Sequence, residues 1–186
     1  MKALKYIAHL ESGQTISSES FIEDGYPVFG GNGFRGYSES FTNEGKHVLI
    51  GRQGALCGNV NYASGKFFAT EHAIVVYHKK GINVLWLGET IKVADFNRLS
   101  QSAAQPGIAV NVIKNVLFPY PPIEEQNEIE LFIETQSAKI ERAIGLQEQQ
   151  IEKLRDLFEL FVVSMLLHPN YFDMFLLFSI YTFRIN

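Results

Sequence analysis

Polar and cationic side chains recur in the glycine- and serine-rich turns of the first 122 residues. In the major groove of DNA, arginine can pair with guanine and asparagine or glutamine can pair with adenine, whereas lysine suits phosphates. The same amides often satisfy only the local backbone of a turn, and this structural role is the alternative interpretation. The candidate DNA-binding residues are Asn32, Arg35, Arg52, Gln53, Asn61, Lys66, His72 and Gln105.

Residue sets that would indicate catalysis are missing from the sequence. Thr70-Glu71-His72 has no second histidine four residues on, and His47 and His78 are too scattered to define a metal site. Neither a G-x-S-x-G elbow nor a G-x-x-x-x-G-K-[ST] phosphate loop occurs. Residues 118–122 resemble the Pro-Pro-aromatic motif of amino-methyltransferases but lack its Asn or Asp. We therefore predict no catalytic residue, no metal and no cofactor bound by this chain.

The composition is typical of a folded protein without disulfides. The 186 residues are 46% hydrophobic, and the single cysteine, Cys57, excludes an internal disulfide and a cysteine-based zinc site. The first residues lack the apolar run and the cleavage site of a secretory signal. The length predicts one domain with an appended element, and we expect a cytoplasmic location.

The net charge of −4 averages two segments of opposite sign. Residues 1–122 contain 11 Lys and Arg against 9 Asp and Glu, which gives +2. Residues 123–186 contain 5 against 11, which gives −6. Because like charges repel, we expect the acidic segment to contact protein rather than DNA.

Residues 1–122 have the pattern of a strand-rich domain. Short runs rich in Val and Ile, such as 48–50 and 73–77, are bounded by Gly, Asn and Ser. The run Gly30-Gly31-Asn32-Gly33 predicts a tight turn that needs a positive φ. Residues 84–101 carry a weaker helical pattern, which predicts a helix in this half.

A long helix is predicted over residues 123–167. Pro122 suits the first turn, and Gly145 is the one helix-weakening residue among good helix formers. Apolar residues recur in steps of three and four, as in a coiled coil, with one extra-long step near Ile140. A helix of about 60 Å cannot bury its apolar stripe on so small a domain and needs a partner helix. The predicted partner-helix residues are Ile129, Ile133, Ile140, Ile144, Ile151, Leu154 and Phe158.

Two features of the acidic segment leave alternatives open. Gln136 and Gln147 fall on the apolar stripe, either as tolerated polar positions or as buried amides that control the register of pairing. Residues 168–186 form an atypical apolar tail, either a packing tail or a sequence that has lost its original reading frame. Its apolar stretch of ten residues is too short to span a bilayer, so no membrane role is expected.

Five ordered phrases resemble the specificity (S) subunit of type I restriction-modification systems. The first three resemble its target recognition domain, and the resemblance extends from about Leu4 to about Leu160. It implies an α+β fold, in which a compact, mixed, strand-rich recognition domain precedes a long α-helix that pairs as an antiparallel coiled coil. The phrases are YPVFGGNG at 26–33, VLIGRQGA at 48–55, FFATEHA at 67–73, SAAQPG at 102–107 and PPIEEQ at 121–126.

The resemblance also implies a division of labour. In this family the globular domain, here 1–122, reads half of a bipartite double-stranded DNA target. The long helix, here 123–167, sets the spacer and docks the methyltransferase (M) subunits. S-adenosylmethionine, ATP and Mg are implied for the M and restriction (R) subunits only. Family members read different targets, so we expect base contacts in the less motif-like loops 34–43 and 59–66, and a phosphate or structural role for Arg52.

The chain departs from the family in two places. The usual subunit has two recognition domains and two long helices, whereas this chain has one of each, and no resemblance continues after about Glu159. A half-length subunit would form a homodimer, combine with another half, or be inactive. The alternative function is a truncated helical interaction fragment that does not bind DNA. A third hypothesis, the recognition part of a fused nuclease-methyltransferase, needs a catalytic sequence ahead of Met1.

Overall fold

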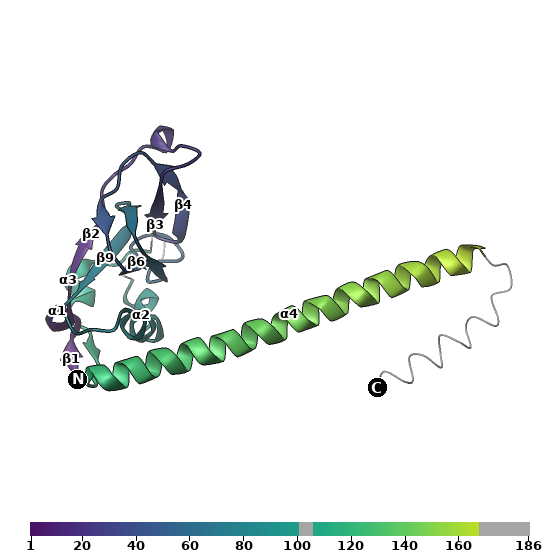
Figure 1. Ribbon diagram of the computed structural model, residues 1–186. Coiled ribbons are helices and arrows are strands. Elements are labelled where there is room, and N and C mark those ends of the chain that lie inside the picture. The colour runs from purple at the N-terminus through teal and green to yellow at the C-terminus, as the bar shows by residue number, and fades with distance from the viewer. Residues whose placement is uncertain (101–105, 168–186) are drawn as a thin grey trace. The chain divides into compact units, whose positions relative to one another are not determined.

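The computed structural model describes residues 1–100 and 106–167. The chain divides into two compact units, one of residues Met1–Phe132 and one that starts at Ile133. Helix α4 (Ile123–Leu167) contributes its first ten residues to the first unit and the others to the second (Figure 1). The predicted tail, residues 168–186, lies outside the described residues.

The first unit is built on two four-stranded sheets. The first sheet is antiparallel and has the order β2 (Ala8–Ser12), β9 (Ala73–His78), β6 (His47–Gly51) and β7 (Val60–Ala63). The second sheet pairs β3 in parallel with β8, and its order is β4 (Gly33–Ser38), β3 (Tyr26–Gly30), β8 (Lys66–Ala69) and β5 (Asn43–Glu44).

Short elements complete this unit. Strand β1 (Lys2–Ala3) pairs with β10 (Leu117–Phe118), which brings the start of the chain next to the segment that leads into α4. The other elements are α1 (Leu4–Ile7), η1 (Ser18–Ser20), α2 (Val84–Val93), η2 (Phe96–Leu99) and α3 (Val110–Ile113).

The core follows the two-residue alternation of the strands. Val48 and Ile50 of β6 join the larger buried cluster, together with Leu87 of α2 and Phe96 of η2. Leu49, between them, points to the opposite face and joins a smaller cluster with Val75 of the neighbouring strand β9 and Phe67 of β8 in the second sheet. Each fully buried aliphatic or aromatic side chain contributes about 1.5–3 kcal/mol, so both faces of the first sheet stabilise the unit.

The predicted fold class is confirmed, because the chain combines a mixed, strand-rich unit with one long C-terminal helix. The glycine run forms the predicted tight turn: Gly30 pairs with Gly33, and Gly33 carries the positive φ of +93°. The helix predicted over 84–101 was too long. Helix α2 ends at Val93, and Asp95 then adopts a left-handed φ of +48°, which separates α2 from η2.

Helix α4 begins directly after Pro122, whose carbonyl accepts a hydrogen bond from Gln126 N at 3.1 Å. Ile129 packs against the larger cluster of the first unit, and Ile133 is half-buried. The remaining predicted partner-helix residues are 50–62% exposed: Ile140, Ile144, Ile151, Leu154 and Phe158. Over 1–100 and 106–167, no helix is long and apolar enough to cross a membrane.

Candidate nucleic-acid interface

Three loops that are distant in the sequence meet beyond the ends of β3, β6 and β8. The backbone of Arg52 donates to the carbonyl of His72 at 2.8 Å, and Thr70 N donates to the carbonyl of Phe29 at 2.9 Å. A fourth segment joins them, because Ile108 N donates to the carbonyl of Arg52 at 2.9 Å. We call this set the loop cluster: residues 31–32, 52–59, 70–72 and 106–108.

Two glycines allow the loops to approach so closely. A Cβ on Gly31 would lie 2.8 Å from the carbonyl oxygen of His72. A Cβ on Gly51 would overlap the carbonyl oxygen of Gly31 and would lie 2.9 Å from that of Leu56. Real Cβ atoms do not approach carbonyl oxygens this closely, so these motif glycines serve the packing of the loops.

Exposed polar side chains of the loop cluster contact one another through polar atoms. Asn59 Nδ2 donates to Asn32 Oδ1 at 2.9 Å, which joins the β3–β4 turn to the loop after β6. His72 Nδ1 lies 3.1 Å from Gln53 Oε1, and its Nε2 lies 3.5 Å from Glu71 Oε1. The cluster thus presents an oriented surface of three amides and an imidazole, and amides are among the groups that recognise base edges.

Two further predicted residues are half-buried: Arg52 belongs to the loop cluster, and Asn61 lies beside it. Asn61 belongs to β7, and its Oδ1 would lie 2.9 Å from a Cβ on Gly33. Within 1–100 and 106–167, Asn61 Nδ2 has no hydrogen-bond partner although the atom is buried. Arg52 holds two loop segments together through its backbone N–H and carbonyl.

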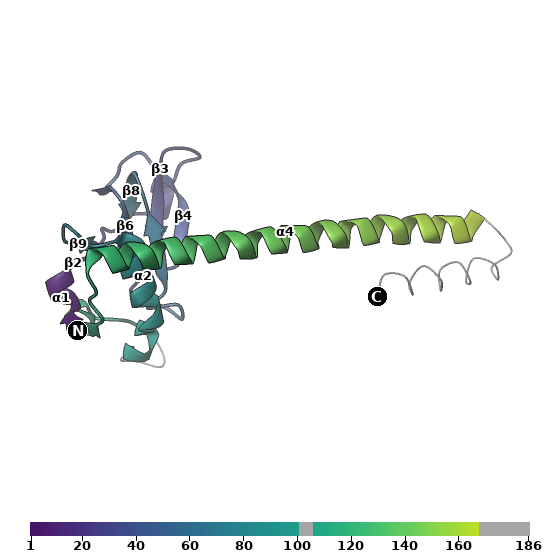
Figure 2. The same ribbon diagram turned by 60° about the horizontal axis from the view of Figure 1, so that its bottom comes forward.

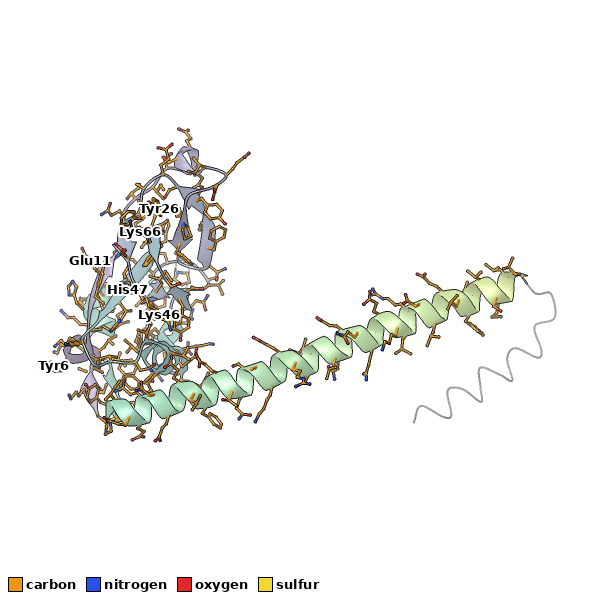
Figure 3. All side chains as sticks on the ribbon, viewed as in Figure 1. Tyr6, Glu11, Tyr26, Lys46, His47 and Lys66 are labelled. Carbon is orange, nitrogen blue, oxygen red and sulfur yellow. The ribbon has the colours of Figure 1, made fainter. Side chains whose placement is uncertain are left out.

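Arg35 and Lys66 are not in the loop cluster. Arg35 is exposed on β4, and its Cγ would lie 3.2 Å from a Cβ on Gly30. Lys66 begins β8, and its Nζ lies 4.7 Å from the ring centroid of Phe41, which also packs on Tyr26 at 4.9 Å. Because β3 and β8 are parallel, Tyr26 and Lys66 lie at the end of this sheet remote from the cluster (Figure 3). Gln105, the last predicted residue, lies outside the described residues.

Three residues that were not among the named candidates take part in or flank the loop cluster, and two of them, Asn59 and Phe34, begin the loops 59–66 and 34–43 in which base contacts were expected. Asn59 orients Asn32, and Asn97 Nδ2 donates to the carbonyl of Cys57 at 2.9 Å, which holds the loop after β6. Phe34 is 53% exposed beside the β3–β4 turn, and its ring packs edge-on against Tyr37 at 5.1 Å. An aromatic residue directly after a glycine turn is a sequence signal that could have named Phe34 as a candidate.

Comparison with known proteins decides the family of this fold. The model of the "Type I restriction modification DNA specificity domain" matches residues 1–155. The chain belongs to this family.

Two curated relatives are specificity subunits. The type I restriction enzyme EcoprrI specificity subunit of Escherichia coli is 44% identical over 130 residues, which are 67% of this chain and 32% of that protein. A putative type I restriction enzyme specificity subunit of Haemophilus influenzae is 26% identical over 117 residues, 61% of this chain and 30% of that protein. The chain therefore matches about a third of the length of these relatives.

Solved structures share the fold. The S subunit of a type I restriction-modification system from M. genitalium has a TM-score of 0.66 at 19% identity, over 88% of this chain and 46% of that one. The HsdS subunit from Thermoanaerobacter tengcongensis has a TM-score of 0.58 at 22% identity, over 76% of this chain and 39% of that one.

Over 1–100 and 106–167, no group of three His, Cys, Asp or Glu is arranged to hold a metal.

Proposed function

We propose that this specificity-family chain reads one half of a bipartite DNA target through its loop cluster and docks M subunits through α4, without catalytic activity of its own. The observation that carries the proposal is the oriented trio of exposed side chains, Asn32, Gln53 and His72, joined by contacts of 2.9 and 3.1 Å with neighbouring loops. Amide side chains recognise base edges, and the family is defined by DNA specificity. All three residues lie in the phrases that carry the family resemblance, so this proposal departs from the expectation that the loops 34–43 and 59–66 contact the bases.

The hydrogen bonds within the cluster influence which base atoms it can recognise. Asn32 Oδ1 is occupied by Asn59, and Gln53 Oε1 lies against His72. Within the described residues the amide N–H groups of Asn32 and Gln53 donate no hydrogen bond, so these donors remain for DNA, while each amide oxygen keeps room for one further hydrogen bond. The donors fit the O6 and N7 atoms of guanine, N7 of adenine or O4 of thymine in the major groove.

The proposed role of α4 rests on its unpartnered apolar stripe. Ile140, Ile151 and Phe158 are 60%, 54% and 62% exposed on a segment of net negative charge. Apolar side chains at coiled-coil spacing are stabilised by a second helix, and the acidic charge disfavours DNA as the partner. The second helix would come from another copy of this chain or from another half-subunit, and the pair would set the spacer between the half-targets.

The chemistry would belong to the rest of the complex. S-adenosylmethionine would be held by the M subunits and ATP with Mg by the R subunits, in the cytoplasm where the DNA is. This chain would determine the DNA site at which the M subunits methylate an adenine.

Co-expression with the M subunits tests the proposal. We expect methylation of one new bipartite motif in the host genome, detected by methylome sequencing, and loss of that motif with Asn32→Ala/Gln53→Ala. A matched Lys92→Gln variant, on the exposed side of α2, should keep the motif. A methylome without any new motif would contradict the proposal for this chain.

The second candidate is a truncated helical interaction fragment that does not bind DNA. The exposed stripe on α4 favours it. It predicts a chain that self-associates yet shows no sequence preference when duplexes carrying candidate targets are compared with random ones at about 150 mM salt.

A further inference from the structure

Four exposed lysines gather at the end of β9 remote from the loop cluster. Lys79 and Lys80 directly follow β9, and Lys79 N donates to the carbonyl of Ile7 at 3.0 Å. Lys5 N donates to the carbonyl of Lys114 at 2.9 Å, so α1 and the end of α3 are neighbours (Figure 1). We call Lys5, Lys79, Lys80 and Lys114 the lysine patch.

The charge of this patch is not neutralised by neighbouring carboxylates. Within the part of the chain that the structure describes, none of the four lysines forms an ion pair. Lys5 Nζ instead donates to the neutral side chain of Asn115 at 2.9 Å. By contrast, Lys92 Nζ on α2 lies 3.5 Å from Glu89 Oε2. An unpaired cluster of this kind attracts a polyanion.

The patch carries a larger positive charge than the recognition segment as a whole. Residues 1–122 carry 11 Lys and Arg against 9 Asp and Glu, a net +2, while the four lysines alone carry +4. The remainder of the segment, including the loop cluster, therefore sums to −2. The loop cluster itself contains one cation, Arg52, and one carboxylate, Glu71, so its formal charge is zero.

The two surfaces are close enough for one duplex. Strand β9 begins at Ala73, directly after His72 of the loop cluster, and ends at His78, directly before Lys79. From His72 to Lys79 the chain makes seven steps of about 3.3 Å each, so the two surfaces lie about 23 Å apart along the strand. That distance is shorter than the 34 Å turn of B-DNA, so a duplex that lies along β9 is long enough to reach both surfaces.

We propose that the lysine patch binds the phosphate backbone of the same DNA duplex whose bases the loop cluster reads. This inference rests on the proposed function. Each lysine that neutralises a phosphate releases counterions, so the patch supplies affinity that depends on salt and not on sequence. The loop cluster, with its small charge, then supplies preference between targets.

The test compares Lys79→Gln/Lys80→Gln with Lys92→Gln in the full chain, using the methylated motif and a scrambled duplex of equal length. We expect the double variant to lower affinity for both duplexes by the same factor, about fivefold per lysine, and to reduce the slope of log K against log salt by about two. Lys92→Gln should bind both duplexes with the affinity and the salt slope of the unmodified protein. Melting curves of all variants check that the fold is retained.

The outcomes separate this inference from the proposed function. Unchanged affinity and salt slope in the double variant would contradict phosphate binding by the lysine patch, while sequence recognition by the loop cluster would be unaffected. Lost co-purification with M subunits at unchanged DNA binding would instead make the patch a protein interface and also overturn it. If the unmodified chain showed no preference between the duplexes but the double variant still weakened both, the proposed function would fail and the phosphate site would stand.

Discussion

Asn83 Nδ2 donates a hydrogen bond of 2.6 Å to Glu130 Oε2, which joins the start of α2 to the first turns of α4 (Figure 2). Asn83 also caps α2, because its Oδ1 accepts from Trp86 N at 2.9 Å. Its backbone N–H donates to Gln126 Oε1 at 3.0 Å, and Gln126 Nε2 donates to the carbonyl of Pro121 at 2.9 Å. Gln126 is 1% exposed, so this polar network is part of the interior of the first unit.

Asn83→Ala should destabilise the first unit by about 2–4 kcal/mol. The variant loses the cap of α2, typically about 1 kcal/mol, and leaves the Trp86 N–H and the Glu130 carboxylate without their partner. Denaturant unfolding followed by the fluorescence of the single tryptophan measures the effect. Asn111→Ala, an exposed side chain on α3, is the control and should change stability by less than about 0.5 kcal/mol. Equal effects from the two variants would contradict the role of the network.

Gly51→Ala should disorder the loop cluster. The added methyl group meets the carbonyl oxygens of Gly31 and Leu56, and overpacking of this kind costs about 1–3 kcal/mol. Gly145→Ala is the matched control, because no atom lies within 4 Å of its Cβ position in α4 and alanine favours a helix by about 0.5–1 kcal/mol. Thermal melts should therefore shift in opposite directions, and hydrogen exchange should rise in residues 52–59 only for Gly51→Ala.

Local patterns in the sequence predicted the regular elements well. The alternation of Val48, Leu49 and Ile50 places them on two faces of a strand, and the structure has them in two core clusters. The run of helix formers after Pro122, with Gly145 as its one helix-weakening residue, predicted α4 from its first residue. Both signals depend on residues a few positions apart, which a sequence displays directly.

Long-range contacts could not be predicted in the same way. Nothing near Asp95 in the sequence indicated the left-handed φ that separates α2 from η2. The lysine patch joins residues 5, 79, 80 and 114 through backbone contacts between elements far apart in the chain. Lys66 was grouped with the loop residues by composition, yet the parallel pairing of β3 and β8 places it at the other end of the sheet. Such relationships are set by tertiary packing.

Gln53→Ala should weaken binding to the target duplex by about 1–3 kcal/mol, roughly 5- to 150-fold, with little change on a scrambled duplex. The variant removes the amide donor but keeps the backbone bridge from residue 53 to Gly107. Competition binding with the two duplexes gives the ratio of the affinities for the target and the scrambled duplex. Lys66→Ala is the comparison: if Lys66 contacts a phosphate, both affinities fall together and the salt slope drops by about one. A parallel loss on both duplexes with Gln53→Ala would make Gln53 a phosphate contact.

Ile140→Asp should abolish pairing of α4 with its partner helix. Ile140 is 60% exposed, so the aspartate is tolerated in the isolated chain, but an unpaired charge becomes costly once a partner helix buries it. Ala138→Asp is the matched control, because its side chain points about 160° away from Ile140 around the helix. Light scattering of the purified chain and co-purification with M subunits should both change for Ile140→Asp alone. If both substitutions leave the oligomeric state unchanged, α4 pairs through another face, and Leu131, Leu146 and Leu157, all about half exposed or more, become the residues to test.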